Sequence, residues 1–424
     1  MPQMHDTRTE TLMSRFSRRD FNRIAVGAAG VAALGTPAFV QAQTRKVKVG
    51  VLLPRSGYLA KIGQSCQMGA DISPTLVKQM YGVEIELMNA DFESKVEEAR
   101  ARAEKLIDDG AQVLVGAFDS GASSAIAQVA EQRKVPFVVN IAAAPQITKQ
   151  GYKYVFRNFP TAPQLVTNGL ALFRDLFQAT GTAPRKAVFM HVNDTFGRAM
   201  SGGIKAILPH LNYLPFKIVD EIGYDPAARD LSVEVAKAKA SGADFVMLVC
   251  RLNDAILLVR EMVKQRYNPM GVVSPGSPGM YEEAFYKTLG KYSNYCISNV
   301  PWYDPKAKIT LAIDAEMKKQ FPKESLLFNA LNVGFTVEAM MVVGDAVKRA
   351  GSTDGTALAN ALRSTDITER MMIGGPIRFN AEGQCDEIAS ACIQNLDERP
   401  TVVLPAKNAE HKPVFPMPSW GKVA

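Results

Sequence analysis

The sequence predicts an α/β protein with two lobes, each built on a mainly parallel sheet. From residue 47 to residue 274, short apolar segments alternate with amphipathic helical patterns. The apolar segments are nearly continuous, which is typical of parallel strands that helices cover on both faces. The proline-containing segment "RNFPTAP" at residues 157–163 interrupts this series, and the alternation then starts again. Two series of strand–helix units therefore predict two sheets.

Four apolar segments of the first series are expected to form strands. They are residues 47–54, 84–91, 111–117 and 135–140. Residues 94–110 form an amphipathic pattern that predicts a helix, with Ser94 as its candidate N-cap and Gly110 at the C-cap position. A second helix is expected over residues 123–133, between the last two strands.

The second series repeats this arrangement with four strands and three helices. Strands are expected at residues 185–191, 216–223, 243–250 and 270–274, and helices at 195–208, 230–241 and 253–265. Beyond them, residues 306–350 are expected to be mostly helical. The ending "PVFPMPSW" contains too many prolines for the interior of a sheet.

The N-terminal residues 1–42 have the pattern of an export signal. An Arg18–Arg19 pair is followed by Phe21, then by an uncharged Ala- and Gly-rich run over residues 24–40, and then by Ala42. This pattern predicts a twin-arginine signal that is read by the Tat export machinery and removed, so the mature chain is expected in the periplasm. The alternative is a membrane anchor, but the run is short and weakly apolar for a stable span.

Composition and motifs exclude several classes of function. The net charge of +7 comes without a Lys/Arg block or a basic stripe interleaved with aromatic residues, so nucleic-acid binding is not expected. The five cysteines form no CxxC motif and the four histidines no HExxH motif, so we expect neither a metal site nor a cofactor. The mature chain lacks GxSxG, P-loop and GxGxxG motifs, so we do not expect an enzyme.

The segment "DSGASS" at residues 119–124 is a candidate anion site. In open parallel sheets, ligands bind beyond the carboxyl ends of the strands. Ser120 follows such a strand, and the amides of Gly121 and Ala122 lead into the next helix. A hydroxyl, free amides and a helix N-terminus all favour an oxyanion. The alternative is an ordinary turn that caps the helix.

Other strand ends offer candidate walls for an apolar pocket. Tyr58 and Ile62 follow the first strand, although Tyr58 has the alternative of a plain loop aromatic. Ile141 and Ala143 in "NIAAAP" offer methyl and backbone groups. Phe196 follows "NDT" in the second series, with ordinary core packing as its alternative.

Arg251 directly follows the buried strand "DFVMLVC". An arginine at that place either pairs with an acidic side chain or holds a ligand carboxylate in bidentate fashion. Asp254 is near enough in sequence to be the structural partner. His191 also ends a strand and is a candidate base, but a lone histidine there is more often structural.

The mature chain resembles the periplasmic solute-binding proteins of branched-chain amino acid ABC transporters, which have the type I fold. The likeness is carried by "KVKVGVLLPRSG", "VLVGAFDSGASSAIAQVAEQRKVPFV", "ITKQGYKYVFRNFPT", "NDTFGRAM" and "SGADFVMLVCRLNDA". It implies two Rossmann-like lobes joined by a three-segment hinge, with crossovers near Thr161, Pro301 and Gly375. Lobe 1 would then comprise residues 43–161 plus 301–375, and lobe 2 residues 162–300 plus 376–424. A solute would be trapped between the lobes and delivered to an ABC permease.

The resemblance also implies roles for particular residues. The family serine that matches Ser120, together with nearby amides, holds the ligand carboxylate. The position of Phe118 contributes apolar contact, and the loop from Tyr58 to Ile62 touches the ligand side chain. On the ammonium side the match fails, because a family threonine falls on Ala143 and a pocket tyrosine on Arg251. The family's ammonium-binding glutamate would lie in "SPGSPG", which has no acid.

These differences predict a preference for a small organic acid without an α-amino group, either an aromatic or aliphatic monocarboxylate or a diacid that spans Ser120 and Arg251. A buried ammonium group needs a carboxylate or several acceptors, and desolvation otherwise costs several kcal/mol. An amino acid ligand is the alternative, with Asp194 in place of the missing glutamate. A periplasmic hydrolase that uses Ser120 or His191 and a ligand sensor that contacts a signalling partner are the other hypotheses.

Overall fold

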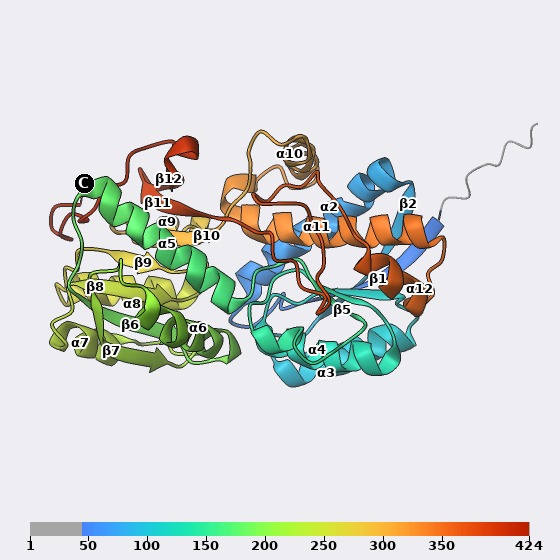
Figure 1. Cartoon of the computed structure of the whole chain (residues 1–424), viewed down its shortest axis with the longest axis horizontal. Coiled ribbons are helices and arrows are strands. Elements are labelled where there is room, and N and C mark those ends of the chain that lie inside the picture. The colour runs from blue at the N-terminus through green and yellow to red at the C-terminus, as the bar shows by residue number, and fades with distance from the viewer. Residues whose placement is uncertain (1–44, 424) are drawn as a thin grey trace, which may run out of the picture. The chain divides into compact units, whose positions relative to one another are not determined.

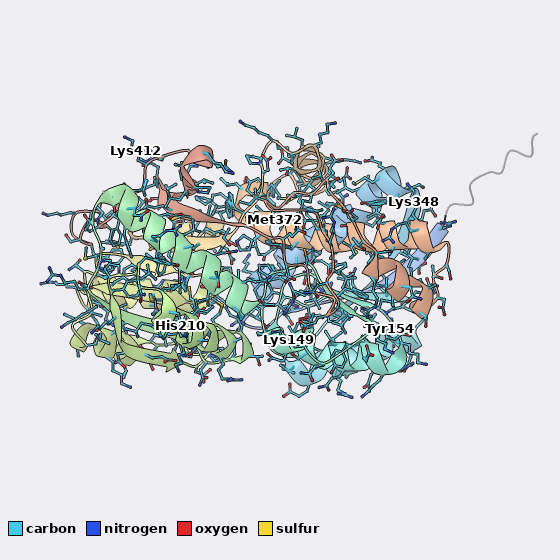
Figure 2. All side chains as sticks on the ribbon, viewed as in Figure 1. Lys149, Tyr154, His210, Lys348, Met372 and Lys412 are labelled. Carbon is cyan, nitrogen blue, oxygen red and sulfur yellow. The ribbon has the colours of Figure 1, made fainter. Side chains whose placement is uncertain are left out.

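The computed structural model describes residues 45–423 of the chain, coloured along the sequence in Figure 1. The predicted export signal at residues 1–42 lies outside these residues. Charged side chains such as Lys348 and Lys412 are exposed, whereas Met372 is buried (Figure 2).

A five-stranded parallel sheet forms the first half of the fold, in the order β2-β1-β3-β4-β5. Its central strands are apolar and buried on both faces, as expected of a sheet covered by helices. The strands are β1 (Arg45–Leu53), β2 (Val83–Asp91), β3 (Val113–Gly116), β4 (Phe137–Val139) and β5 (Val155–Arg157). The helices of this series are α2 (Ala60–Tyr81), α3 (Val96–Asp108) and α4 (Ser120–Arg133).

A seven-stranded sheet forms the second half, in the order β12-β11-β10-β9-β8-β6-β7. The strands are β6 (Lys186–Val192), β7 (Lys217–Tyr224), β8 (Phe245–Val249), β9 (Val272–Ser274), β10 (Ile297–Pro301), β11 (Ser390–Leu396) and β12 (Arg399–Leu404). Strands β6 to β10 pair in parallel, whereas β11 and β12 add an antiparallel edge. The helices are α5 (Ala162–Thr180), α6 (Thr195–Ile207), α7 (Ser232–Ala240), α8 (Leu252–Lys264) and α9 (Glu283–Leu289).

After β10 the chain returns to the first sheet before it completes the second. Helices α10 (Lys308–Gln320), α11 (Leu326–Ala350) and α12 (Gly355–Arg363) follow β10, and α11 packs along α2 (Figure 1). Strands β11 and β12 then come back to pair beside β10. The division into lobes at residues 161, 301 and 375 stays a prediction. Short 3₁₀ turns lie at Pro145–Ile147, Leu208–His210, Gly290–Ser293 and Ala406–Asn408.

Among the described helices, α11 is the one long and apolar enough to cross a membrane by length and composition. Of its most apolar stretch, 83% is buried inside the protein. Its side chains pack against α2 and against β1 to β4 of the first sheet. Its apolar composition is therefore explained by its place as a core helix between these elements.

The two-lobed α/β prediction is confirmed, but two helix starts differ from expectation. Ser94 was wrongly expected to cap α3, because its hydroxyl instead donates to the carbonyl of Ser56 at 2.7 Å and accepts from the amide of Leu59 at 3.1 Å. Helix α4 begins at Ser120 instead of residue 123, because the carboxylate of Asp119 caps it. The sequence interpretation also missed helices α2, α5, α9 and α12 and strands β5 and β10 to β12.

Candidate functional site

In the "DSGASS" turn, the side chains of Asp119 and Ser120 already accept hydrogen bonds from backbone amides. The carboxylate of Asp119 accepts a hydrogen bond from the amide of Ala122 at 2.8 Å, which is the usual role of an aspartate N-cap. The hydroxyl of Ser120 accepts from the amide of Ala144 at 3.3 Å, so it ties the start of α4 to the loop after β4. The expected helix cap is therefore present, and a bound carboxylate at Ser120, Gly121 and Ala122 stays a prediction.

Arg251 lies between β8 and α8, as the N-cap residue of α8, and is 5% exposed. Its Nη1 contacts the carboxylate of Asp194, and its Nη2 donates to Oδ2 of Asp119 at 3.4 Å. The guanidinium carbon also lies 5.3 Å from the centre of the Phe196 ring, within cation–π range. The guanidinium is thus held by two carboxylates and one aromatic face.

Asp254, the candidate structural partner of Arg251, contacts the backbone of Arg251 and not its guanidinium. Its carboxylate accepts from the backbone amide of Arg251 at 2.9 and 3.1 Å, so it caps α8. It also accepts from the hydroxyl of Tyr224 at 2.7 Å. Because Asp254 is the third residue of α8, its carboxylate can reach back to the backbone amide of Arg251, the N-cap residue of that helix.

Contacts at this point join the two sheets. Asp119 follows β3 of the first sheet, whereas Arg251 and Asp194 follow β8 and β6 of the second. The side-chain amide of Asn253 adds a second link, donating to the carbonyl of Tyr58 at 3.1 Å. The carboxyl ends of the two sheets therefore meet at Arg251, as expected of parallel sheets that share one cleft.

The charges in this cluster influence one another strongly. Burial raises the pKa of Asp119, although Arg251 counteracts part of that rise. Burial acts to lower the pKa of Arg251, but Asp194 and Asp119 more than offset it and raise that pKa overall. Burial raises the pKa of Asp254 to about 6. The guanidinium therefore stays charged, while Asp119 and Asp254 are the groups that gain protons as the pH falls.

A small cavity lies on one side of Arg251, between the two sheets. It offers about 20 Å³ to a water-sized sphere, which is room for about one water molecule. A larger solute therefore requires its walls to move apart. Arg251 is the one charged residue among those that line it, which are Phe118, Ile141, Ala142, Ala143, Phe159, Phe196, Arg251, Gly276, Pro278, Val300, Pro301 and Leu331.

A second cavity, of about 150 Å³, also has Arg251 in its lining. Tyr58 and Ile62 line it together with Arg251, Asn253 and Asp254. The predicted apolar wall residues thus divide between two cavities that both have Arg251 in their lining. Ser120, Gly121 and Ala122 are not among the lining residues of either cavity.

His191, a candidate base, is engaged within the second sheet. Its Nε2 lies 3.2 Å from the carboxylate of Glu221 and its Nδ1 lies 3.0 Å from the carbonyl of Val192. Its ring stacks on Phe189 with centroids 5.1 Å apart. These contacts favour the structural role.

Sequence reasoning missed Arg157, which supports a pocket wall. Its buried guanidinium donates to the carbonyls of Ala142 and Ala144 at 2.9 and 2.7 Å, and to Gln384 and Thr148. Burial lowers the pKa of Arg157 to about 9, since no carboxylate of the described residues pairs with it. It fixes the loop that contributes Ile141 to Ala143 to the cavity. The sequence signal for this role is an arginine next to Val155 and Phe156 in an apolar strand.

Comparison with known proteins gives the family. The first of the relatives is the Leu/Ile/Val-binding protein homolog 8 of Brucella suis, which is 26% identical over 60% of this chain; the match spans 64% of that relative, just under two thirds. A crystal structure of a leucine-binding protein from Thermotoga maritima has a TM-score of 0.72 at 23% identity, covering 84% of this chain and 97% of that one. A solute-binding protein from Rhodopseudomonas palustris, solved with benzoate, has a TM-score of 0.69 at 18% identity, covering 84% and 95%.

The family model described as "Periplasmic binding protein" matches residues 46–394, which is most of the chain. The solved structures share the α/β fold with its two sheets, so the predicted type I fold is confirmed. The resemblance noted in the sequence is likewise confirmed by the Leu/Ile/Val-binding relatives. The chain belongs to the periplasmic binding protein family.

Proposed function

We propose that this protein captures a small organic acid between its two sheets in the periplasm and delivers it to an ABC permease. We further propose that it reaches the periplasm by the twin-arginine route. The observation that carries the ligand proposal is Arg251, a buried cation facing a cavity whose other lining residues are uncharged. A guanidinium pairs with a carboxylate through two parallel hydrogen bonds.

The chemistry of the walls supports an acid with an apolar body. Phe118, Phe159 and Phe196 line the cavity and offer ring faces and edges to a planar solute. The Nε of Arg251 is buried and has no hydrogen-bond partner among the described residues, so it is a donor for an incoming oxygen. The neighbour from Rhodopseudomonas palustris, with its bound benzoate, has a ligand of this class.

Binding requires an exchange of partners at Arg251. Asp119 and Asp194 already neutralise the guanidinium, and a third carboxylate beside them is repelled unless one of them moves away. The contact to Asp119 is the longer one and crosses between the sheets. We propose that the solute carboxylate takes the place of Asp119 at Arg251.

An amino acid is the second candidate. Asp119 and Asp194 lie beside Arg251 and provide acceptors that an α-ammonium group needs on burial. The leucine-binding neighbour from Thermotoga maritima binds a ligand of that class by its name. We propose no catalytic role for Ser120 or His191, since the hydroxyl of Ser120 and the ring of His191 already have protein partners.

A thermal-shift screen of the purified protein tests the proposal. Benzoate, a branched aliphatic acid such as 3-methylbutanoate, a dicarboxylate and leucine form the ligand set. We expect the monocarboxylates to raise the melting temperature and leucine to have no effect. Stabilisation by leucine alone would favour the second candidate, and isothermal titration then gives the affinity of each positive ligand.

A further inference from the structure

The loop "SPGSPG" at residues 274–279 packs against the turn that carries Arg251. Its Gly276 and Pro278 line the cavity of about 20 Å³ together with Arg251, so the loop forms part of the wall of the proposed solute site. Its two serines are not among the lining residues of that cavity. Their hydroxyls point instead to contacts within the protein, and these contacts reach the backbone next to Arg251.

The hydroxyl of Ser277 continues the hydrogen bonding of β8 beyond the end of β9. Strands β8 and β9 share two registered residue pairs, and β9 then ends at Ser274. Further along β8, the Ser277 hydroxyl accepts from the amide of Cys250 at 3.0 Å and donates to the carbonyl of Leu248 at 3.3 Å. In a parallel ladder, one residue bonds a carbonyl and an amide two positions apart on its neighbour. A side chain therefore takes the place of a strand residue just before the chain reaches Arg251.

Ser277 is itself held in place by its loop. The hydroxyl of Ser274 accepts from the amide of Ser277 at 2.7 Å and from the amide of Gly276 at 3.2 Å. The two serine hydroxyls lie 2.8 Å apart, and both residues are 0% exposed. Because water does not reach this network, a hydroxyl that is removed from it leaves buried partners unpaired.

Three contacts fix the backbone around Arg251. The amide of the preceding residue, Cys250, is held by Ser277, and the amide of Arg251 itself donates to Asp254 at 2.9 Å. Gly279 packs so closely that a Cβ there would lie 2.5 Å from the carbonyl carbon of Arg251, and its φ of +110° also disfavours a side chain. A guanidinium that pairs with a carboxylate through two parallel hydrogen bonds needs a fixed plane, and a fixed backbone is the base for it.

We propose that Ser277 is a positioning residue of the solute site and that it acts through Arg251. Its hydroxyl holds the amide of Cys250, and this sets the position from which the Arg251 guanidinium meets the solute carboxylate. Ser277 does not touch the solute. The expected effect on solute binding rests on the proposed function, whereas the effect on the guanidinium is present without a solute.

A double-mutant cycle separates positioning from a general loss of stability. Ser277→Ala is expected to weaken benzoate binding at least about fivefold, as measured by titration calorimetry. In the Arg251→Lys background the bidentate geometry is already lost, so the same change is expected to have less than about a twofold effect. Ser293→Ala is the matched control and is expected to leave the affinity unchanged. Ser293 is also 0% exposed, and its hydroxyl donates to the carbonyl of Gly290 at 2.7 Å.

The guanidinium is also observed in the absence of a solute. In protein with isotope-labelled arginine, the Nε–H signal of Arg251 in a nuclear magnetic resonance spectrum is identified by its absence from Arg251→Lys. We expect this signal to shift in Ser277→Ala and to stay in place in Ser293→Ala. If Ser277→Ala does not fold, Ser277→Cys replaces it in both measurements, because a thiol has a similar shape and forms weaker hydrogen bonds.

An equal loss of benzoate affinity in the two backgrounds would overturn the proposal, because it would show a structural effect that does not pass through Arg251. An Arg251 signal that the Ser277 variant leaves in place would also overturn it. If no carboxylate binds the unaltered protein, the proposed function fails, and the position of the Arg251 signal alone decides whether Ser277 positions the guanidinium.

Discussion

The Nη2 atom of Arg251 donates to Oδ2 of Asp119 at 3.4 Å, and this contact links the second sheet to the first. Nη1 of the same guanidinium contacts Asp194 within the second sheet. The cavity beside Arg251 leaves only about 20 Å³ of open space. The ion pair of Arg251 with Asp119 holds the two sheets together at this point. A solute carboxylate that replaces Asp119 would preserve the charge balance of Arg251 while it changes what holds the sheets together.

Replacement of Arg251 is expected to weaken carboxylate binding. Arg251→Ala should lower the affinity at least tenfold, about 1.4 kcal/mol, as measured by titration calorimetry. The same change leaves Asp119 and Asp194 without their cation and should cost about 3–5 kcal/mol of unfolding free energy. Arg251→Lys keeps the charge and loses the bidentate geometry, so it should fold and still bind more weakly. Affinity unchanged in both variants would remove Arg251 from the site.

Replacement of Asp119 separates the two candidate ligands. Asparagine caps a helix about as well as aspartate, so Asp119→Asn should preserve α4. It removes the competitor for Arg251, so carboxylate affinity at neutral pH should rise by about tenfold, roughly 1.4 kcal/mol. An amino acid ligand would instead bind more weakly, because an acceptor for its ammonium group is lost. Asp109→Asn, at an exposed aspartate, is the control.

The pH dependence of carboxylate binding follows from the same residue. Burial raises the pKa of Asp119, so this carboxyl gains a proton earlier than an exposed aspartate as the pH falls. The protonated form competes less well for Arg251, and the affinity for an ionised organic acid should therefore increase from about pH 8 to about pH 5.5. Calorimetry across that range should show the increase in the unaltered protein and a flatter profile in Asp119→Asn. An affinity that falls with pH would contradict the exchange.

Stability should depend on pH through Glu282. Burial raises the pKa of Glu282 to about 8 from an ordinary value of 4.5, so the folded state keeps a proton that the unfolded state releases. Its contribution to the unfolding free energy is complete below pH 4.5 and is lost as the pH rises to about 8, at about 1.4 kcal/mol per unit. Asp254, whose pKa burial raises to about 6, contributes mainly below the interval from pH 6 to 8.

Urea unfolding of Glu282→Gln therefore isolates this contribution between pH 6 and pH 8. The unaltered protein should lose stability across that interval, and the variant should lose much less. Glu97→Gln should behave like the unaltered protein, because the residue is exposed. Parallel curves for Glu282→Gln and the unaltered protein would show that Glu282 is ionised throughout.

Arg157 should be essential for the wall that its guanidinium supports. Arg157→Met leaves the carbonyls of Ala142 and Ala144 and the side chain of Gln384 without their donor. Each buried acceptor that loses its partner costs about 1–3 kcal/mol, so the unfolding free energy should fall by about 3 kcal/mol or more. Arg229→Met, at an exposed arginine, should change it by less than about 0.5 kcal/mol.

The fold class could be predicted from the sequence because the buried parallel strands are short, apolar and locally readable. The segment around Val246 is an example, since every residue of β8 is buried. Strands β11 and β12 were missed because they contain Gln394, Asn395 and Thr401 and form an antiparallel edge with a partner far away in sequence. The pairing of β11 with β10 is a tertiary effect that no local pattern encodes.

Individual residues of the candidate site could be predicted at strand ends, but the contacts between them could not. Arg251 and Phe196 stand out locally, and both line the cavity. Phe159 and Leu331 line it too, but they come from a connecting segment and from a core helix, so only the folded chain brings them there. The place of Asp119 before α4 indicates a helix cap. Its contact with Arg251 depends on how the two sheets meet, which the sequence does not show.

The antiparallel pair β11–β12 also has a consequence for how the chain is made. Strand β10 receives its outer neighbour from residues 390–396, after α10, α11 and α12 have already been synthesised. Until then its backbone donors and acceptors on that side are open to any other extended segment, which is the usual starting point of aggregation. A chain truncated before β11, or one still emerging from a ribosome, is thus expected to need a chaperone until its final strands arrive.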